Sequence, residues 1–136
     1  MLNQKSLSHK DAMTIVLAVY EKASAEKKGL AIAVVDPHGE LIAFLRTDGC
    51  RFSSIQIAQN KAYTAAREQI PSKELGQHSQ DGNFPMTNFG ELRYLTWGGG
   101  LPIFHDGELI GAVGVSGLPE SEDIEFAQYA LSVLDL

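Results

Sequence analysis

The sequence predicts a single α+β domain over residues 1–136, with a five-stranded antiparallel sheet and flanking helices. Two short connections between apolar segments support this fold class. Residues Asp36–Gly39 have the Asp-Pro-x-Gly pattern of a type I turn, and His105–Glu108 contain Asp-Gly. Both connections predict antiparallel hairpins, which argues against a doubly wound parallel sheet. The expected order is helix, two strands, helix, a short helix, three strands and a closing helix.

The first helix is expected from Ser8 to about Lys28, because apolar residues recur there at helical spacing. Ser8 can cap this helix, and Asp11 completes a capping-box pattern. Two strands are expected next, over Leu30–Asp36 and Glu40–Arg46. The first of them is almost wholly apolar and should be central in the sheet.

A second helix is expected from Ser53 to about Gln69, with Ser53 and Gln56 as its capping box. Pro71 ends this helix or starts a short one, and Gln77–Asn88 read as a polar loop. The second helix carries a narrow stripe of small side chains, which would let it approach a sheet closely. The stripe consists of Ile55, Ala58, Ala62 and Ala65.

The last third of the chain predicts the other three strands. Leu92–Trp97 reads as extended and is followed by Gly98–Gly100. Leu101–Phe104 and Leu109–Ser116 should then pair across the Asp-Gly turn. After Pro119, acidic residues that suit a helix N-terminus begin the closing helix.

Composition excludes several classes of protein. The apolar fraction of 44% and the charged fraction of 21% are typical of globular chains. A net charge of −6 disfavours nucleic-acid binding, which needs a basic surface. The one cysteine, Cys50, rules out an intrachain disulfide or a zinc site built on several cysteines. No apolar segment is long enough to span a bilayer and no signal core follows the start, so we expect a cytoplasmic protein.

Three consecutive glycines, Gly98–Gly100, form the first candidate binding element. Their backbone N–H groups are unshielded and can form an anion-binding nest. A β-bulge or a close backbone crossing is the commoner reason for such a segment. No Gly-Lys-Ser/Thr follows, so the segment is not a P-loop.

Two cations are further candidates for ligand contacts. Arg46 ends an apolar strand, where its guanidinium can hold a carboxylate or can pair with Asp48 as an exposed end residue. Lys61 lies at the edge of the small-residue stripe, where its ammonium either reaches water or meets an anion in a cleft. Function would require Arg46, Lys61 and the glycine segment to share one pocket.

The four histidines do not predict a metal site, since no pair has the i, i+4 spacing of a zinc enzyme. His38 and His105 are expected at solvated turn tips. His9 starts a helix and His78 lies in the polar loop, and either could ligate a metal or haem iron in a suitable geometry. Cys50 has no base in any motif and reads as an ordinary thiol.

Several blocks of residues together resemble the GlcG/HbpS-like family, which includes the C-terminal domain of PduO-type corrinoid adenosyltransferases. The resemblance runs from about Ser8 to Leu134. It rests on the order and spacing of Ala33-Val34-Val35-Asp36 with Gly39, Arg46, Asn60-Lys61-Ala62, Gly98-Gly99-Gly100-Leu101-Pro102-Ile103, and Ile110-Gly111-Ala112-Val113-Gly114-Val115-Ser116-Gly117 with Asp123.

The resemblance implies a sheet related to PAS or profilin folds, and dimers that build into tetramers or octamers. Some members bind haem, and others accompany glycolate, glycerol or propanediol utilisation genes. The histidine that ligates haem in the PduO-type branch belongs to the N-terminal helix, and no firm match links it to His9. The positions that match, and that we expect to bind ligand, are Arg46, Lys61, Gly98, Gly99, Gly100 and Pro102.

These observations favour a non-enzymatic binding module for a small anionic ligand, either a small carboxylate or the propionate side of a haem-like tetrapyrrole. The alternative is an enzyme acting on a small hydroxy acid or aldehyde, with Lys61 as a base or Schiff-base former. A third possibility is an assembly protein. Its small sheet face of Ala112, Gly114 and Ser116 would pack either on another copy or on a helix of the same chain.

Overall fold

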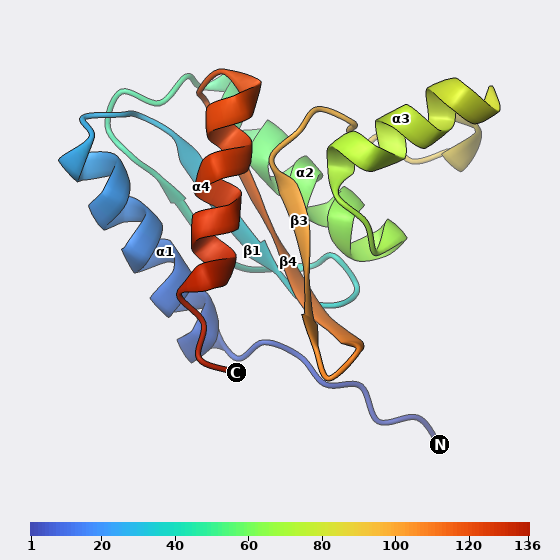
Figure 1. Cartoon of the computed structure of the whole chain (residues 1–136), viewed down its shortest axis with the longest axis horizontal. Helices are drawn as coiled ribbons and strands as arrows, with labels where there is room; N and C mark the ends of the chain where they lie inside the picture. The colour runs from blue at the N-terminus through green and yellow to red at the C-terminus, as the bar shows by residue number, and fades with distance from the viewer.

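The computed structural model describes all 136 residues as four α-helices, one short 3₁₀ helix and four strands. Figure 1 shows their arrangement along the chain. The elements are α1 His9–Ala25, β1 Ala31–Val35, β2 Leu41–Arg46, α2 Ser53–Glu68, α3 Ser72–Gly82, η1 Met86–Phe89, β3 Gly100–His105, β4 Glu108–Ser116 and α4 Glu120–Ser132.

The sheet has four strands in the order β2-β1-β4-β3, and every neighbouring pair is antiparallel. The α+β class and both hairpins are confirmed, but the prediction of a five-stranded sheet is wrong. The expected fifth strand, Leu92–Trp97, is irregular because helix side chains bind its backbone. Leu95 N–H donates to Thr64 Oγ1 at 2.8 Å, and Trp97 C=O accepts from Ser72 Oγ at 2.7 Å.

Helices cover both faces of the sheet (Figure 1). On one face, α1 and α4 pack against the strands around buried residues such as Ile15, Ile32 and Phe126. On the other face lies α2, whose alanines meet the small residues of β1 and β4. The helix α3 projects away from this body. None of the helices combines the length and the apolar character needed to cross a membrane.

The helix α2 approaches the sheet very closely. A Cβ placed on Gly114 of β4 would lie 2.1 Å from the backbone oxygen of Ala58, and one on Gly100 of β3 would lie 2.3 Å from that of Lys61. Ala58, Ala62 and Ala65 are fully buried in this contact. Three of the four residues of the expected stripe therefore form the surface on which α2 rests, and Ile55 is only partly buried. A helix of the same chain covers the small face of β4.

Helix boundaries follow local chemistry, with three differences from expectation. The capping box of Ser8 and Asp11 is present. The one expected at Ser53 is absent, because Phe52 occupies the N-cap position and no side chain caps α2. The helix α1 ends at Ala25 and not at Lys28, since Lys27 has a left-handed backbone with φ of 55°. The expected polar loop after Gln77 is partly helical, because α3 continues to Gly82.

Candidate functional site

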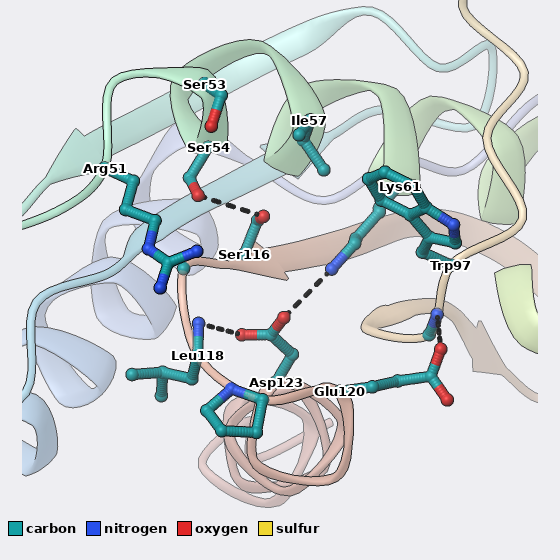
Figure 2. Close-up of a pocket in the computed structure, with 13 residues that line it drawn as sticks. Arg51, Ser53, Ser54, Ile57, Lys61, Trp97, Ser116, Leu118, Glu120 and Asp123 are labelled. Carbon is teal, nitrogen blue, oxygen red and sulfur yellow. Dashed lines mark hydrogen bonds and ion pairs between the residues drawn. The ribbon is translucent and has the colours of Figure 1, made fainter.

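A polar cavity of about 610 Å³ opens where the N-terminal ends of α2 and α4 meet the end of β4 (Figure 2). Trp97 and Gly98, just before β3, form another part of its wall. This volume falls in the range of small-ligand sites, roughly 300–1,000 Å³. The lining residues are Arg51, Ser53, Ser54, Ile57, Lys61, Trp97, Gly98, Ser116, Gly117, Leu118, Pro119, Glu120 and Asp123.

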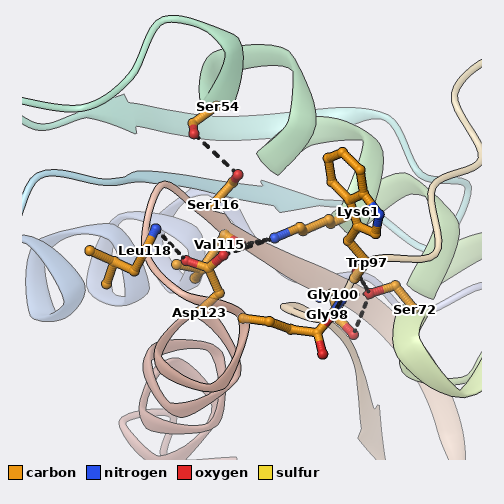
Figure 3. A network of polar contacts seen from close by, with 11 residues as sticks. Ser54, Lys61, Ser72, Trp97, Gly98, Gly100, Val115, Ser116, Leu118 and Asp123 are labelled. Carbon is orange, nitrogen blue, oxygen red and sulfur yellow. Dashed lines mark hydrogen bonds and ion pairs between the residues drawn. The ribbon is translucent and has the colours of Figure 1, made fainter.

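A buried ion pair forms the inner wall of this polar cavity. Lys61 of α2 and Asp123 of α4 are only 2% and 3% exposed, and Lys61 Nζ lies 3.1 Å from Asp123 Oδ2. The ammonium also donates to the Val115 carbonyl at 2.9 Å. Asp123 Oδ1 accepts the N–H of Leu118 at 3.0 Å (Figure 3). The pair therefore joins α2, the end of β4 and the first turn of α4.

Burial opposes both charges of the pair. Desolvation lowers the pKa of Lys61, although the neighbouring Asp123 carboxylate opposes this shift. Desolvation likewise raises the pKa of Asp123 against the effect of the ammonium. An ammonium has three N–H donors, and two of them are used in the contacts above. The third N–H has no hydrogen-bond partner in the protein, and Lys61 lines the cavity.

The glycine segment is mostly bound by the protein itself. Gly98 N–H donates to Glu120 Oε2 at 3.1 Å, and Gly100 N–H donates to Ser72 Oγ at 3.0 Å. The carbonyl of Gly99 accepts the N–H of Val115 at 3.0 Å. With φ of 124°, Gly99 also passes close to the Lys61 ammonium, where a Cβ would lie 3.1 Å from Nζ. These contacts give the segment a structural role beside the cavity.

The structure separates the residues that the sequence singled out. Lys61 and Gly98 line the polar cavity, and Gly99 adjoins Lys61. Pro102 is paired with Ala112 in the edge strand β3 and does not line the cavity. Arg46 is exposed at the end of β2, where its guanidinium lies 5.4 Å from the ring centre of Phe52. It is not among the lining residues.

Of the residues that line the cavity, only Lys61 and Gly98 were predicted as site residues, and the charged Arg51 and Asp123 are among those missed. Arg51 supplies the cation in place of Arg46, and its guanidinium points toward the space between Ser116 and Leu118 (Figure 2). Its position just before a helix start was the available signal. Asp123 enters the sequence-based prediction only through the family resemblance. Its place four residues before Ala127, on the buried face of α4, could have shown that this carboxylate points inward.

An apolar groove of about 660 Å³ forms a second candidate site, between α1 and β2. Met13 of α1 is 65% exposed there, and Leu17 and Tyr20 of the same helix are also exposed. His9 lies one turn before Met13. The groove is lined by His9, Lys10, Met13, Thr14, Val16, Leu17, Tyr20, Ala43, Phe44 and Leu45.

Comparison with known proteins identifies the family of this fold. The family described as haem degrading protein HbpS-like matches residues 7–132, which is nearly the whole chain. The chain belongs to the HbpS-like family. This assignment confirms the family resemblance found in the sequence.

Three relatives of this HbpS-like protein illustrate the similarity. Protein GlcG of Escherichia coli K12 is 37% identical over 116 residues, which cover 81% of each chain. The solved structure of Klebsiella pneumoniae protein ORFY has a TM-score of 0.91 at 30% identity, and the match covers 98% of this chain and 93% of that one. A complex of PduOC with haem has a TM-score of 0.88 at 28% identity, with 96% of each chain covered.

The residues of this HbpS-like protein fit haem in one of the two sites. Haem iron in proteins is held by His, Cys, Met or Tyr side chains. The polar cavity has none of these among its lining residues. The apolar groove offers His9, Met13 and Tyr20 beside an apolar wall, with Lys10 as a cation for a carboxylate. Cys50 lies in neither site, and desolvation raises the pKa of its buried thiol.

Proposed function

We propose that this protein is a haem-binding module, with the tetrapyrrole in the apolar groove between α1 and β2. The observation that carries the proposal is an unpartnered apolar helix face beside a histidine. His9 and Met13 are four residues apart and therefore lie on one side of α1. The family description and the haem complex of PduOC support the same ligand class.

Different residues of the groove would contact different parts of the haem. His9 can hold the iron through an imidazole nitrogen, and Lys10 can pair with a propionate. Leu17 and Phe44 offer apolar surface to the ring. When bound, the iron porphyrin supplies a redox-active metal whose properties depend on its axial ligand.

Replacing His9 with alanine is expected to weaken haem binding about tenfold or more, because the iron loses its axial ligand. Haem is titrated into the protein and its main absorption band is followed. His38→Ala is the matched control, since this histidine occupies a turn between β1 and β2. Equal affinity of the His9 variant and the wild type would reject His9 as the ligand. No saturable band in the wild type would reject the whole proposal.

A second candidate function is Schiff-base chemistry at Lys61. Its ammonium lines the polar cavity, and burial lowers the pKa of Lys61. A lower pKa increases the fraction of the neutral amine, which is the form that attacks aldehydes. The amine and an aldehyde would form an imine with loss of water, and borohydride would reduce it to a stable secondary amine. Glycolaldehyde with borohydride, followed by peptide mass mapping, tests this. An unmodified Lys61 peptide rejects it.

We further infer that copies of the chain associate, as the resemblance implies for dimers up to octamers. Large exposed apolar side chains outside the apolar groove, such as Phe52, Leu92 and Phe104, support association. The cytoplasmic location expected from the sequence, and the link to glycolate, glycerol or propanediol metabolism that the family resemblance implies, are part of the same proposal. Light scattering measures the mass directly, and a mass of 14.8 kDa would reject association.

A further inference from the structure

The polar cavity has no role in haem binding as proposed above, and it shares no lining residue with the apolar groove. We propose that this cavity binds a small monocarboxylate that carries, besides the carboxylate, a second oxygen-bearing group. The carboxylate would lie against Arg51, and the second oxygen, a hydroxyl or a keto group, would accept a hydrogen bond from Lys61.

Arg51 is suited to the carboxylate because its charge is not used by the protein. None of the ion pairs of the structure includes its guanidinium. Figure 2 shows it directed to the space beside Leu118. A guanidinium can bind a carboxylate through two parallel hydrogen bonds, which fixes the orientation of the ligand as well as its position.

Lys61 and Ser54 supply donors for the second oxygen. The ammonium of Lys61 is held in place by Val115 and Asp123 and keeps one donor free. Ser116 Oγ donates to Ser54 Oγ at 3.2 Å (Figure 3). The hydroxyl hydrogen of Ser54 is therefore free to donate to a ligand. Because these groups are already held in place, ordering them on binding would reduce the affinity of a ligand only slightly.

The charges around the cavity select a ligand with a single negative charge. Lys61 and Asp123 compensate each other, and the charge of Glu120 is compensated by Lys73, whose Nζ lies 3.0 Å away. Arg51 is then the one cation left over. The helices α2 and α4 also begin at the cavity wall, so the positive ends of two helix dipoles lie there. A phosphate dianion would bring an uncompensated negative charge close to the two carboxylates.

The apolar part of the wall limits the body of the ligand. Ile57, Leu118 and Trp97 line the cavity between the polar groups. The indole of Trp97 is 60% exposed, so a ligand would cover part of it on binding. A short carbon skeleton between two oxygen-bearing groups matches this alternation of apolar and polar surface.

Trp97 provides the test, because it is the only tryptophan of the chain and it lines the cavity. Its fluorescence is followed while sodium lactate, pyruvate, acetate, phosphate or chloride is added at constant ionic strength, up to about 20 mM so that millimolar affinities are covered. We expect a saturable change with lactate or pyruvate, weaker binding of acetate and phosphate, and no saturable change with chloride.

Arg51→Gln is expected to weaken the binding of lactate or pyruvate about tenfold or more, since a charged bidentate contact is lost. Arg46→Gln, which removes an exposed guanidinium that does not line the cavity, should leave the affinity within about twofold. The absence of a saturable change with both acids would overturn the proposal, as would an unchanged affinity in Arg51→Gln. Haem titration of the same samples separates this result from the groove, because haem binding should be unaltered in Arg51→Gln.

Discussion

Replacing Asp123 with asparagine is expected to lower the free energy of unfolding by about 3–5 kcal/mol. The substitution keeps an acceptor for the N–H of Leu118 and removes only the charge that balances Lys61. The Lys61 ammonium is then buried without a counter-charge. This costs more than the loss of an exposed pair, for which the usual range is about 0.2–1 kcal/mol.

The double variant Lys61→Met with Asp123→Asn should recover a large part of the lost stability. Burial lowers the pKa of Lys61 and raises the pKa of Asp123, so the folded state disfavours both charges. A neutral pair avoids that cost, and the two single effects should not add. Urea unfolding of the wild type, Lys61→Met, Asp123→Asn and the double variant measures this coupling. Lys73→Met is the control, because its exposed pair with Glu120 should contribute less than about 1 kcal/mol.

A double variant that is less stable than either single variant would contradict this account. It would mean that Lys61 contributes chiefly through its contact with Val115 and its packing, and that the charge balance with Asp123 is secondary. The same variants report on the cavity, because the pair joins the wall formed by α2 to the wall formed by α4. Trp97 fluorescence during unfolding shows whether the cavity opens before the rest of the chain.

The hairpins and the stripe of α2 could be predicted because their causes are local. The turn at Asp36 depends on Pro37 and Gly39 within four residues, and Gly39 N–H donates to the Asp36 carbonyl at 3.0 Å. The small residues of α2 recur at helical spacing and so define one face without any knowledge of the sheet. In both cases the residues that define the feature lie within a few positions of one another in the sequence.

The prediction of a fifth strand was wrong because a sequence preference for extended backbone does not supply a neighbouring strand to pair with. Residues Leu92–Trp97 have the composition of a strand, but their backbone groups find Thr64 and Ser72. These hydroxyls come from α2 and α3, about 25–31 positions away in the chain. A tertiary hydrogen bond of this kind overrides β-propensity, which is weak and depends on context.

The candidate site was predicted only in part for a similar reason. Lys61 was recognised at the edge of an apolar stripe, and the structure brings it to a cavity with Gly98. Its partner Asp123 is 62 residues away, and no local pattern connects the two. Arg46 and Arg51 flank the same turn, and only the path of that turn decides which guanidinium faces the cavity. The sequence could indicate a cation there but not which one.

Replacing Gly114 with valine is expected to be the most damaging single change in the sheet, with a loss of about 3 kcal/mol or more. Even the first side-chain carbon would lie 2.1 Å from the Ala58 carbonyl and 2.6 Å from the Ala62 nitrogen. Both atoms belong to the backbone of α2, so they cannot move aside as a flexible side chain would. The helix must shift as a whole, which also displaces Lys61 from Asp123.

Gly82→Ala is the control for this glycine, because its Cβ would meet only the side chain of Phe84 and no backbone atom. At the end of α3, alanine should change stability by less than about 1 kcal/mol. Thermal unfolding with circular dichroism compares the two variants. If Gly114→Val unfolded at nearly the wild-type temperature, α2 would not rest on β4 as closely as described. The position of Lys61 would then be free to vary, and the cavity would not be a preformed site.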